Sequence, residues 1–482
     1  MNYAMIRYII GWILNFEAAF MSPSFVVGLI YREKSAWAIF ATMLLCLVIG
    51  VPMVLLKRPK QAVFYAKDGF VSVGLSWVVL SVMGALPFVI SGSIPHPVDA
   101  LFETVSGFTT TGSSILPEVE SMAHCLLFWR SFTHWIGGMG VVMFALVILP
   151  ALGTSKMMLS SVEMSTLARD NYRYRAQMVV QILLFVYVGL TIFLHFHAEI
   201  RRNELVRCRM SFDVGLCDQR VRNQKVPVSP FDDSAMIDMV LIFAMGISGI
   251  HFGLIYATVT GKRNNIFRSE VTLFYLGMLI LGSLLIALSL YIADIYPTFR
   301  SSLRFASFQF VSVTSTSGFA TADSSLWTPF AIILLILGSL ICACAGSTSG
   351  GMKANRALMA LKMLYIRVKQ QQHPNAVIRL KMDGVIQEAG VLHTVSLFIV
   401  AYLLLILIGT ILCTLFGVDL MTSFSGCVAS IGNVGPGFGG VNSMANYGDL
   451  PAIVKFIFTA LMLLGRLEIF GLLQFLLIRW WK

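Results

Sequence analysis

The strongest constraint on this chain is a succession of about ten apolar stretches, each close to the roughly 20 residues that a helix needs to cross a bilayer. Of its 482 residues, 57% are hydrophobic and only 12% are charged, which is typical of a multi-pass membrane protein and excludes a soluble enzyme. We expect an all-α polytopic membrane protein. The spans are expected near residues 8–30, 36–56, 69–91, 124–150, 174–197, 236–260, 270–295, 327–365, 391–417 and 451–480.

Positive charge distinguishes the two sides of the membrane. Lys and Arg gather in alternate connections between the spans, and such connections face the cytoplasm. The net charge of +11 therefore follows from topology and does not indicate nucleic acid as a partner. The first stretch, Met1 to Ile30, is long enough to span and is expected to be a retained helix and not a cleaved signal.

Three short segments rich in Gly, Thr and Ser interrupt the apolar pattern. Lipid offers no hydrogen bonds, so irregular backbone at membrane depth persists only where it is buried in protein or lines a watery cavity. Backbone carbonyls that face such a cavity can replace the hydration shell of a cation. Each segment is therefore expected to be one strand of an ion filter. The segments are Thr109–Gly112, Thr314–Gly318 and Gly432–Gly435.

A short apolar run precedes each of these segments, at residues 97–105, 304–313 and 419–428. About ten residues of helix extend roughly 15 Å, half the thickness of a membrane, so such a helix enters the membrane without crossing it. Its C-terminal end would carry a partial negative charge that favours cations at the centre of a pore. After the first two spans, the others thus pair into a repeat of span, half-helix, filter segment and span.

At this point the chain resembles a known family, the Trk/Ktr/HKT superfamily of potassium transporters, and most closely the membrane subunit of its TrkH branch. The resemblance covers nearly the whole chain and depends on an ordered set of motifs, since a single Thr-Thr-Gly is weak evidence. The motifs are TVSGFTTTG at 104–112, WIGGMG at 135–140, STSGFAT at 315–321, AGSTSGGMK at 345–353, GNVGPG at 432–437 and GRLE at 465–468.

The resemblance implies two N-terminal helices followed by four helix–pore loop–helix repeats in a pseudo-fourfold arrangement around one pore. The implied units are an extension at 1–68 and repeats at 69–171, 172–269, 270–387 and 388–482. It also implies a homodimer, a cytosolic nucleotide-binding regulatory subunit of the TrkA type, and a place among the lipids of a bacterial inner membrane. Potassium would be the transported ion, with no organic cofactor.

By position, the resemblance assigns the potassium filter to three glycines and the residues before them. Glycine suits a filter because its backbone adopts dihedral angles that a Cβ disfavours and allows close approach to an ion. Glycine in all three segments leans toward K⁺ over Na⁺ by resemblance. The assigned residues are Thr110, Thr111, Gly112, Thr316, Ser317, Gly318, Asn433, Val434 and Gly435.

A second candidate site is a gating loop below the filter, which interrupts the apolar run that begins at Phe330. Glycines and hydroxyls break a helix at mid-membrane and suit a segment that moves. The alternative is a static kink in one helix. The assigned residues are Gly346, Ser347, Thr348, Ser349, Gly350 and Gly351.

Arg466 in the last span is the third candidate. An arginine inside a membrane is a functional candidate, usually turned to a cavity or a carboxylate. By resemblance, its charge lies beneath the filter and forms a barrier to cations together with the gating loop. The alternative is a structural ion pair with Glu468 or another acid. Glu103, on the first half-helix, is expected either to focus cations or, more in keeping with its place, to serve a structural role.

The second repeat departs from the family pattern. Residues 199–233 contain no apolar half-helix and no filter glycine, and they place several arginines on the side of the membrane where the other connections have few. Either this loop has diverged to plug or regulate the pore, or about 30 residues are read out of frame between two compensating indels. We favour the second explanation because glycine codons read one base off give Arg and Trp, and family-like sequence resumes near Ser234.

The sequence predicts uptake of monovalent cations, chiefly potassium, through a gated channel-like pore. A sodium-coupled secondary carrier is one alternative, although the repeats of such carriers are usually inverted. A non-conducting or impaired regulatory paralogue is the other alternative, and the unusual second loop is the feature that suggests it. An enzyme is not expected because no convergent acid, base, nucleophile or metal-binding set is present.

Overall fold

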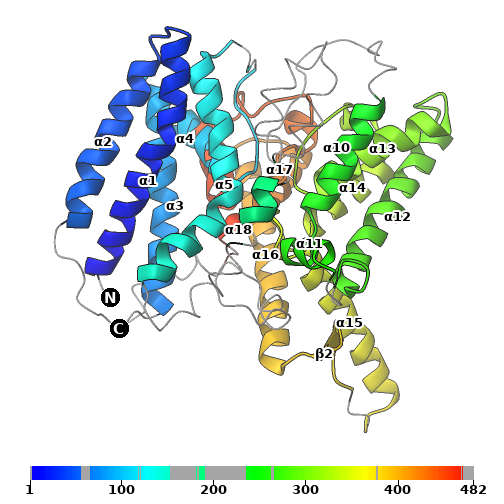
Figure 1. The fold of residues 1–482 in the computed structure, drawn as a ribbon. Coiled ribbons are helices and arrows are strands. Elements are labelled where there is room, and N and C mark those ends of the chain that lie inside the picture. The colour runs from blue at the N-terminus through cyan, green and yellow to red at the C-terminus, as the bar shows by residue number, and fades with distance from the viewer. Residues whose placement is uncertain are drawn as a thin grey trace.

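The structure is a computed structural model that describes residues 3–55, 66–117, 119, 121–151, 181, 184–189, 191, 235–261, 265–375, 378–467 and 469. The unusual segment 199–233 and most of the span expected at 174–197 lie outside the described residues. The N-terminal helices are α1 (Tyr3–Ile30) and α2 (Ala36–Leu55). They pack side by side against α3 (Ala66–Ile90) and α5 (His124–Ala151) at one end of the bundle (Figure 1).

The described chain contains three copies of one unit, a long helix followed by a short helix and a second helix. The first copy is α3, α4 (Pro97–Phe108) and α5. The second is α12 (Glu270–Ile292), α13 (Phe299–Thr314) and α14 (Pro329–Ile341), with a 3₁₀ turn at Ser324–Leu326. The third is α16 (Ala389–Leu415), α17 (Leu420–Gly432) and α18 (Ala452–Arg466), with a 3₁₀ turn at Gly439–Val441.

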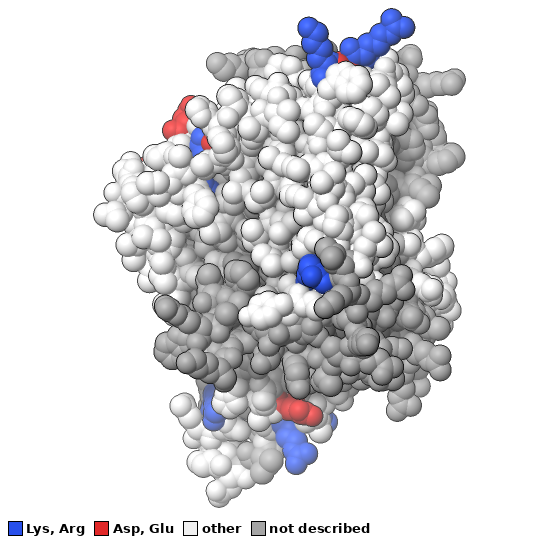
Figure 2. Space-filling view, turned by 90° about the vertical axis from the view of Figure 1, so that its left-hand side faces the viewer, with Lys and Arg blue, Asp and Glu red and all other residues white. Residues whose placement is uncertain are grey.

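Several helices are long and apolar enough to cross a membrane. Within the described residues these are α1, α2, the part of α3 from Val71 to Ile90, α12 and α16, together with one bent pair of helices. Large apolar side chains such as Leu404 and Ile411 remain exposed on them, as expected for helices that face lipid. Figure 2 shows a broad, largely uncharged band on one face, with most of its charged atoms toward the top and bottom.

The three short helices α4, α13 and α17 confirm the expected half-helices. They contain 12, 16 and 13 residues, so none reaches the roughly 30 Å of a bilayer core. Pro97 starts α4, and the Asp419 carboxylate caps α17 by accepting from the Thr422 N–H. The helix α13 starts earlier than its apolar run predicted, because Thr298 and Ser301 form a capping box.

One expected span is wrong in its shape. The stretch predicted as a single helix at 236–260 is divided into α10 (Ala235–Ser248) and α11 (Phe252–Val259), which bend by 104°. The break falls at Gly249, and His251 caps the second helix by accepting from the Gly253 N–H. Gly249 thus follows the end of the first helix, and a capping side chain begins the second, within an otherwise apolar run.

The stretch at 327–365 is interrupted, as predicted. The helix α14 ends at Ile341 and α15 (Ala354–Gln372) begins after a non-helical segment at 342–353. Below the bundle in Figure 1, α15 leads to a small antiparallel pair of strands, β1 (Lys381–Met382) and β2 (Val385–Ile386), which the sequence did not indicate. Helix α12 contacts α15 through an ion pair between Glu270 and Lys362.

Candidate functional site

The extended segments that follow the three half-helices have the same backbone conformation. Thr110, Thr316 and Asn433 occupy the left-handed region at φ of 56°, 61° and 52°. Two residues later, Gly112, Gly318 and Gly435 have φ of 72°, 73° and 103°. A positive φ is a strained outlier for a β-branched residue such as threonine. The same strain repeated at matching places indicates a backbone path that the surrounding protein imposes.

The hydrogen bonds repeat in register as well. The N–H groups of Thr111, Ser317 and Val434 each donate to a carbonyl five residues earlier at 2.9 Å, the carbonyls of Ser106, Ser312 and Ala429. In addition, the Ser106 hydroxyl donates to the Ser113 carbonyl at 2.6 Å, and the Ser312 hydroxyl donates to the Phe319 carbonyl at 2.7 Å. Each segment is thus folded back onto the end of its own half-helix.

The structure places all nine predicted filter residues in buried positions. Numbered by the four expected repeats, the segments at 109–112, 314–318 and 432–435 are the first, third and fourth, and the first and fourth are in contact. The Asn433 carboxamide donates to the Thr111 hydroxyl at 2.9 Å. The Gly435 carbonyl accepts from the Ser113 hydroxyl at 3.0 Å and from the Tyr447 hydroxyl at 2.8 Å. Both lone pairs of this carbonyl are therefore engaged by the protein, which the sequence did not indicate.

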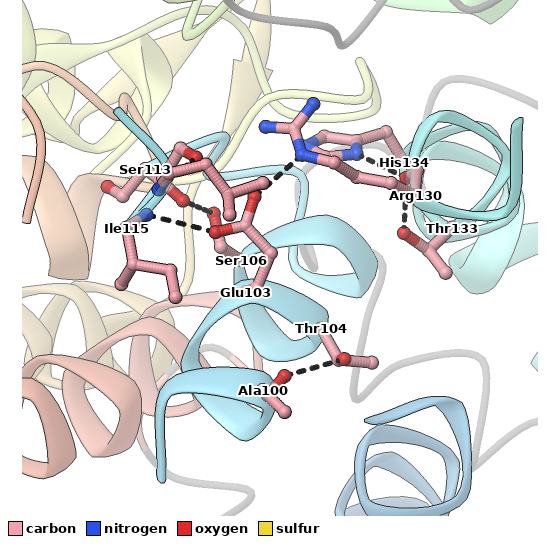
Figure 3. A network of polar contacts seen from close by, with 11 residues as sticks. Ala100, Glu103, Thr104, Ser106, Ser113, Ile115, Arg130, Thr133 and His134 are labelled. Carbon is pink, nitrogen blue, oxygen red and sulfur yellow. Dashed lines mark hydrogen bonds and ion pairs between the residues drawn. The ribbon is translucent and has the colours of Figure 1, made fainter. Parts of the chain in front are cut away.

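A buried ion pair supports the first segment (Figure 3). Glu103 of α4 accepts from Arg130 Nε of α5 at 2.6 Å and, through its other oxygen, from the Ile115 N–H at 3.0 Å. Both side chains are about 2% exposed or less. The carboxylate thus fixes the chain beyond Gly112 to the half-helix, so the structural role of Glu103 is the one that its contacts support. Nothing in the sequence indicated Arg130 as the partner of Glu103.

The helices that follow the three filter segments are α5, α14 and α18, and we call them the exit helices. They approach the half-helices closely through glycines. A Cβ at Gly137 of α5 would collide with the Phe108 carbonyl at the end of α4, and one at Gly465 of α18 would collide with the Ile431 carbonyl at the end of α17. At Gly338 of α14 it would lie 2.8 Å from the Thr314 hydroxyl of α13. Small residues of this kind permit close helix packing in membranes.

The predicted gating loop lies between α14 and α15 and has an irregular backbone. Positive φ values occur at Cys342 (56°), Gly346 (81°), Gly351 (74°) and Lys353 (73°). The break between α10 and α11 holds this loop by two backbone hydrogen bonds, from the Phe252 N–H to the Gly346 carbonyl at 3.1 Å and from the Cys344 N–H to the Gly249 carbonyl at 3.0 Å. A merely kinked helix does not describe these 12 residues.

Arg466 lies at the end of α18 and is 8% exposed. Its Nη1 donates to the Thr348 carbonyl of the loop at 2.8 Å, and its Nη2 donates to the Gly137 carbonyl of α5 at 2.7 Å. The structure therefore brings together the second and third sites that the sequence singled out. The alternative partner, Glu468, lies outside the described residues.

Comparisons with known proteins agree over the length of the chain. The model of the family TrkH, described as cation transport protein, matches residues 35–200 and 279–479. The chain is 32% identical to the "Trk system potassium uptake protein TrkH" of Salmonella typhimurium and 31% identical to that of Halomonas elongata, and each match covers 100% of both proteins. The crystal structure of the potassium transporter TrkH from Vibrio parahaemolyticus is similar at a TM-score of 0.86 and 28% identity, covering 100% of both chains.

The residues that the family model leaves between its two matches are 201–278. They include nearly all of the segment 199–233, whose sequence departs from the pattern of the other repeats. The second match begins later than Ser234, where family-like sequence was expected to resume.

Proposed function

Because this chain belongs to the TrkH family of cation transport proteins, we propose that it takes up monovalent cations, chiefly potassium, across the cytoplasmic membrane of a bacterium. The observation that carries this proposal is the threefold repetition of one strained backbone path at the ends of three half-helices. A soluble protein or a carrier without pore loops has no need of this repetition. A filter made of backbone carbonyls requires it, because each part must present oxygens to the same ion.

In this proposal the filter carbonyls belong to the nine residues that the sequence assigned. The C-terminal ends of α4, α13 and α17 would add partial negative charge beneath the ion. Two hydrogen bonds already engage the Gly435 carbonyl, which makes this oxygen a weaker ion ligand. Passage would be controlled by loop 346–351 and Arg466, whose two hydrogen bonds join the loop to α5.

The assembly follows from the family and is part of the proposal. We propose four pore repeats after the extension 1–68, with the boundaries given above, and a homodimer that binds a cytosolic nucleotide-binding subunit of the TrkA type. The curated relatives are named as proteins of the Trk system, which supports a multi-component assembly. Helix α15 and the strands β1 and β2 extend from the bundle and are available for such a subunit (Figure 1).

A second candidate function is favoured by one observation, the sequence of residues 199–233. A pore that lacks one quarter of its filter would coordinate a dehydrated ion less completely, so the chain would be an impaired or non-conducting regulatory paralogue. The gate contacts of the second repeat, from Gly249 and Phe252, are present whichever function holds.

The test is uptake of ⁸⁶Rb⁺ and ²²Na⁺ into proteoliposomes. The chain would be compared with a version in which a family-like pore loop replaces residues 199–233. Uptake of ⁸⁶Rb⁺ by both would support a conducting transporter, and uptake by the repaired version alone would support the impaired paralogue. If neither version takes up either ion, the proposed function is wrong.

A pair of glycine variants tests whether ion uptake depends on the proposed filter. Gly318→Ala places a Cβ at a φ of 73° and is expected to reduce uptake strongly. Gly277→Ala on α12 is the matched control, since nothing lies within 4 Å of a Cβ at that position. Equal uptake by the two variants would mean that Gly318 is not part of the filter.

A further inference from the structure

The fourth filter segment carries a different side chain at the strained position. Thr110 and Thr316 occupy this place in the first and third segments, whereas the fourth has Asn433. Its side chain is fully buried, and its Nδ2 donates to two acceptors, the Thr111 hydroxyl at 2.9 Å and the Met462 carbonyl of α18 at 3.0 Å. The carboxamide therefore joins the fourth segment to the first and to the exit helix. A threonine is too short to make both contacts.

The other end of the carboxamide is unsatisfied. Asn433 Oδ1 is buried with no hydrogen-bond partner among the residues that the structure describes. A buried acceptor without a partner carries a free-energy cost, so its surroundings call for an explanation.

The loop at 342–353 covers this oxygen. A Cβ at Gly350 would lie 2.5 Å from Asn433 Oδ1 and 2.8 Å from the Gly432 carbonyl oxygen, so only a glycine allows the loop to rest here. Gly465 of α18 also lies close, since a Cβ there would lie 3.0 Å from Oδ1. The backbone of the loop thus contacts the carboxamide and excludes water from the oxygen.

The same helix that accepts from Asn433 also holds the loop. Met462 and Arg466 lie one turn apart on α18, and Arg466 donates to the Thr348 carbonyl two residues before Gly350. Filter, exit helix and loop therefore form a closed series of contacts, in which the Asn433 side chain of the filter touches both the exit helix and the loop.

We propose that the Asn433 side chain is a specificity-determining residue that links the ion selectivity of the filter to the position of the gating loop. This inference rests on the proposed function. With the loop seated, Nδ2 clamps the first and fourth segments together while Oδ1 is left without a partner. When the loop withdraws, water reaches Oδ1 and the carboxamide is free to shift, so the geometry of the filter changes as the gate opens.

The test uses Asn433→Thr, which gives the fourth segment the side chain of the first and third. Loss of Nδ2 releases the clamp, and the ratio of ⁸⁶Rb⁺ to ²²Na⁺ uptake is expected to fall at least about five-fold. Loss of Oδ1 removes the unsatisfied acceptor beneath Gly350, so the seated loop becomes more stable.

The position of the loop is measured with a cysteine at Ser349, which is 5% exposed with the loop seated. The rate at which a charged thiol reagent modifies Ser349→Cys reports how often the loop withdraws, and the chain that retains Ser349 gives the background from native cysteines. In the Asn433→Thr background we expect modification to be at least about five-fold slower. A chain that is merely damaged would show faster modification.

Thr316→Asn, the reverse exchange in the third segment, is the control for the loop measurement and is expected to leave the modification rate unchanged. A changed uptake ratio with an unchanged rate in Asn433→Thr would overturn the link, because Asn433 would then act within the filter alone. An unchanged ratio would overturn it too. The modification rate needs no flux, so failure of the proposed function is recognised separately, by absent ⁸⁶Rb⁺ uptake in the repaired chain.

Discussion

At the scale of residues, two buried charged side chains near the filter segments, Glu103 and Arg466, have specific partners. The Glu103 carboxylate joins Arg130 to the backbone beyond the first filter segment, and the Arg466 guanidinium joins the gating loop to α5. A charge taken out of water needs such partners, because its desolvation costs several kcal/mol. Substitution of either residue is therefore expected to have a measurable effect.

Replacement of Glu103 by Gln keeps the shape of the side chain but removes the carboxylate that Arg130 contacts. We expect the protein to lose about 3 kcal/mol of stability, because breaking a buried pair costs more than the pair contributes. Thermal unfolding in detergent measures this loss. The double variant Glu103→Leu with Arg130→Met should recover most of it. An unchanged melting temperature in Glu103→Gln would contradict the prediction.

Replacement of Arg466 by Gln removes both hydrogen bonds and the positive charge that we propose as a barrier to cations. We expect ⁸⁶Rb⁺ uptake to rise about ten-fold, since one charge-assisted hydrogen bond is worth about 1.5–3 kcal/mol to the seated loop. Arg466→Lys keeps the charge but has no planar fork with which to bridge Thr348 and Gly137, so its uptake should be intermediate. Lower uptake by a folded Arg466→Gln variant would show that the arginine does not act as a barrier.

At the scale of elements, the exit helices are seated against the half-helices by glycines. In Gly465→Ala, the Cβ meets the Ile431 carbonyl, which is backbone and moves only with α17. Overpacking of this kind costs about 1–3 kcal/mol, and we expect a lower melting temperature together with reduced ion uptake. Gly137→Ala should behave in the same way at the end of α4. Gly277→Ala faces open space and should leave both measurements unchanged.

The loop between α1 and α2 is joined to α5 by a carboxylate. Glu33 accepts from the N–H groups of His124 and Cys125, where α5 begins, at 2.8 Å and 2.9 Å. Burial alone would raise the pKa of Glu33, but these hydrogen bonds and those of the two side chains lower it to about 2 from its ordinary value of 4.5. A depressed pKa means that the carboxylate stabilises the fold fully above pH 4.5 and that this contribution is lost as pH falls toward 2.

Glu33→Gln is therefore expected to unfold at a lower temperature than the original chain at pH 7, by the equivalent of ~1 kcal/mol. The difference should shrink as the pH is lowered from 4.5 toward 2, which thermal unfolding across that range measures. Glu388 precedes α16 without a capping hydrogen bond from its side chain, so Glu388→Gln is the matched control. A difference that stays constant with pH would mean that the charge of Glu33 is not responsible.

At the scale of the whole molecule, the sequence predicted the elements that follow from hydrophobic length. The spans expected near 8–30, 36–56, 69–91, 124–150, 270–295 and 391–417, the half-helices before the three filter segments and the interruption after α14 are in place, because apolar runs and glycines are local signals. The break in the span at 236–260 was missed, since one glycine within an apolar run is common in membrane helices. The early start of α13 was missed because a capping box among polar residues carries no hydrophobic signal.

The contacts of the site join separate segments of the chain and could not be predicted from the sequence. The positive φ of Thr110 and Thr316 contradicts the usual preference of threonine. The Tyr447 hydroxyl on the Gly435 carbonyl and the Arg130 guanidinium on Glu103 join segments whose sequence separation gives no clue to their contact. The ion-binding and gating roles of the assigned residues stay predictions until flux is measured.

The anchoring of the loop at the break between α10 and α11 has a consequence for how this chain can evolve. Both hydrogen bonds there are made by backbone atoms, and both acceptors are carbonyls of glycines that a Cβ would crowd, so the anchoring requires a path of the main chain and glycine at positions 249 and 346. Residues 249–252 therefore continue to anchor the loop at 342–353 when mutation or a shifted frame changes residues 199–233. Under the proposed function, a chain with an altered second pore loop would therefore keep these contacts of its gating loop, and restoring residues 199–233 alone would complete the filter.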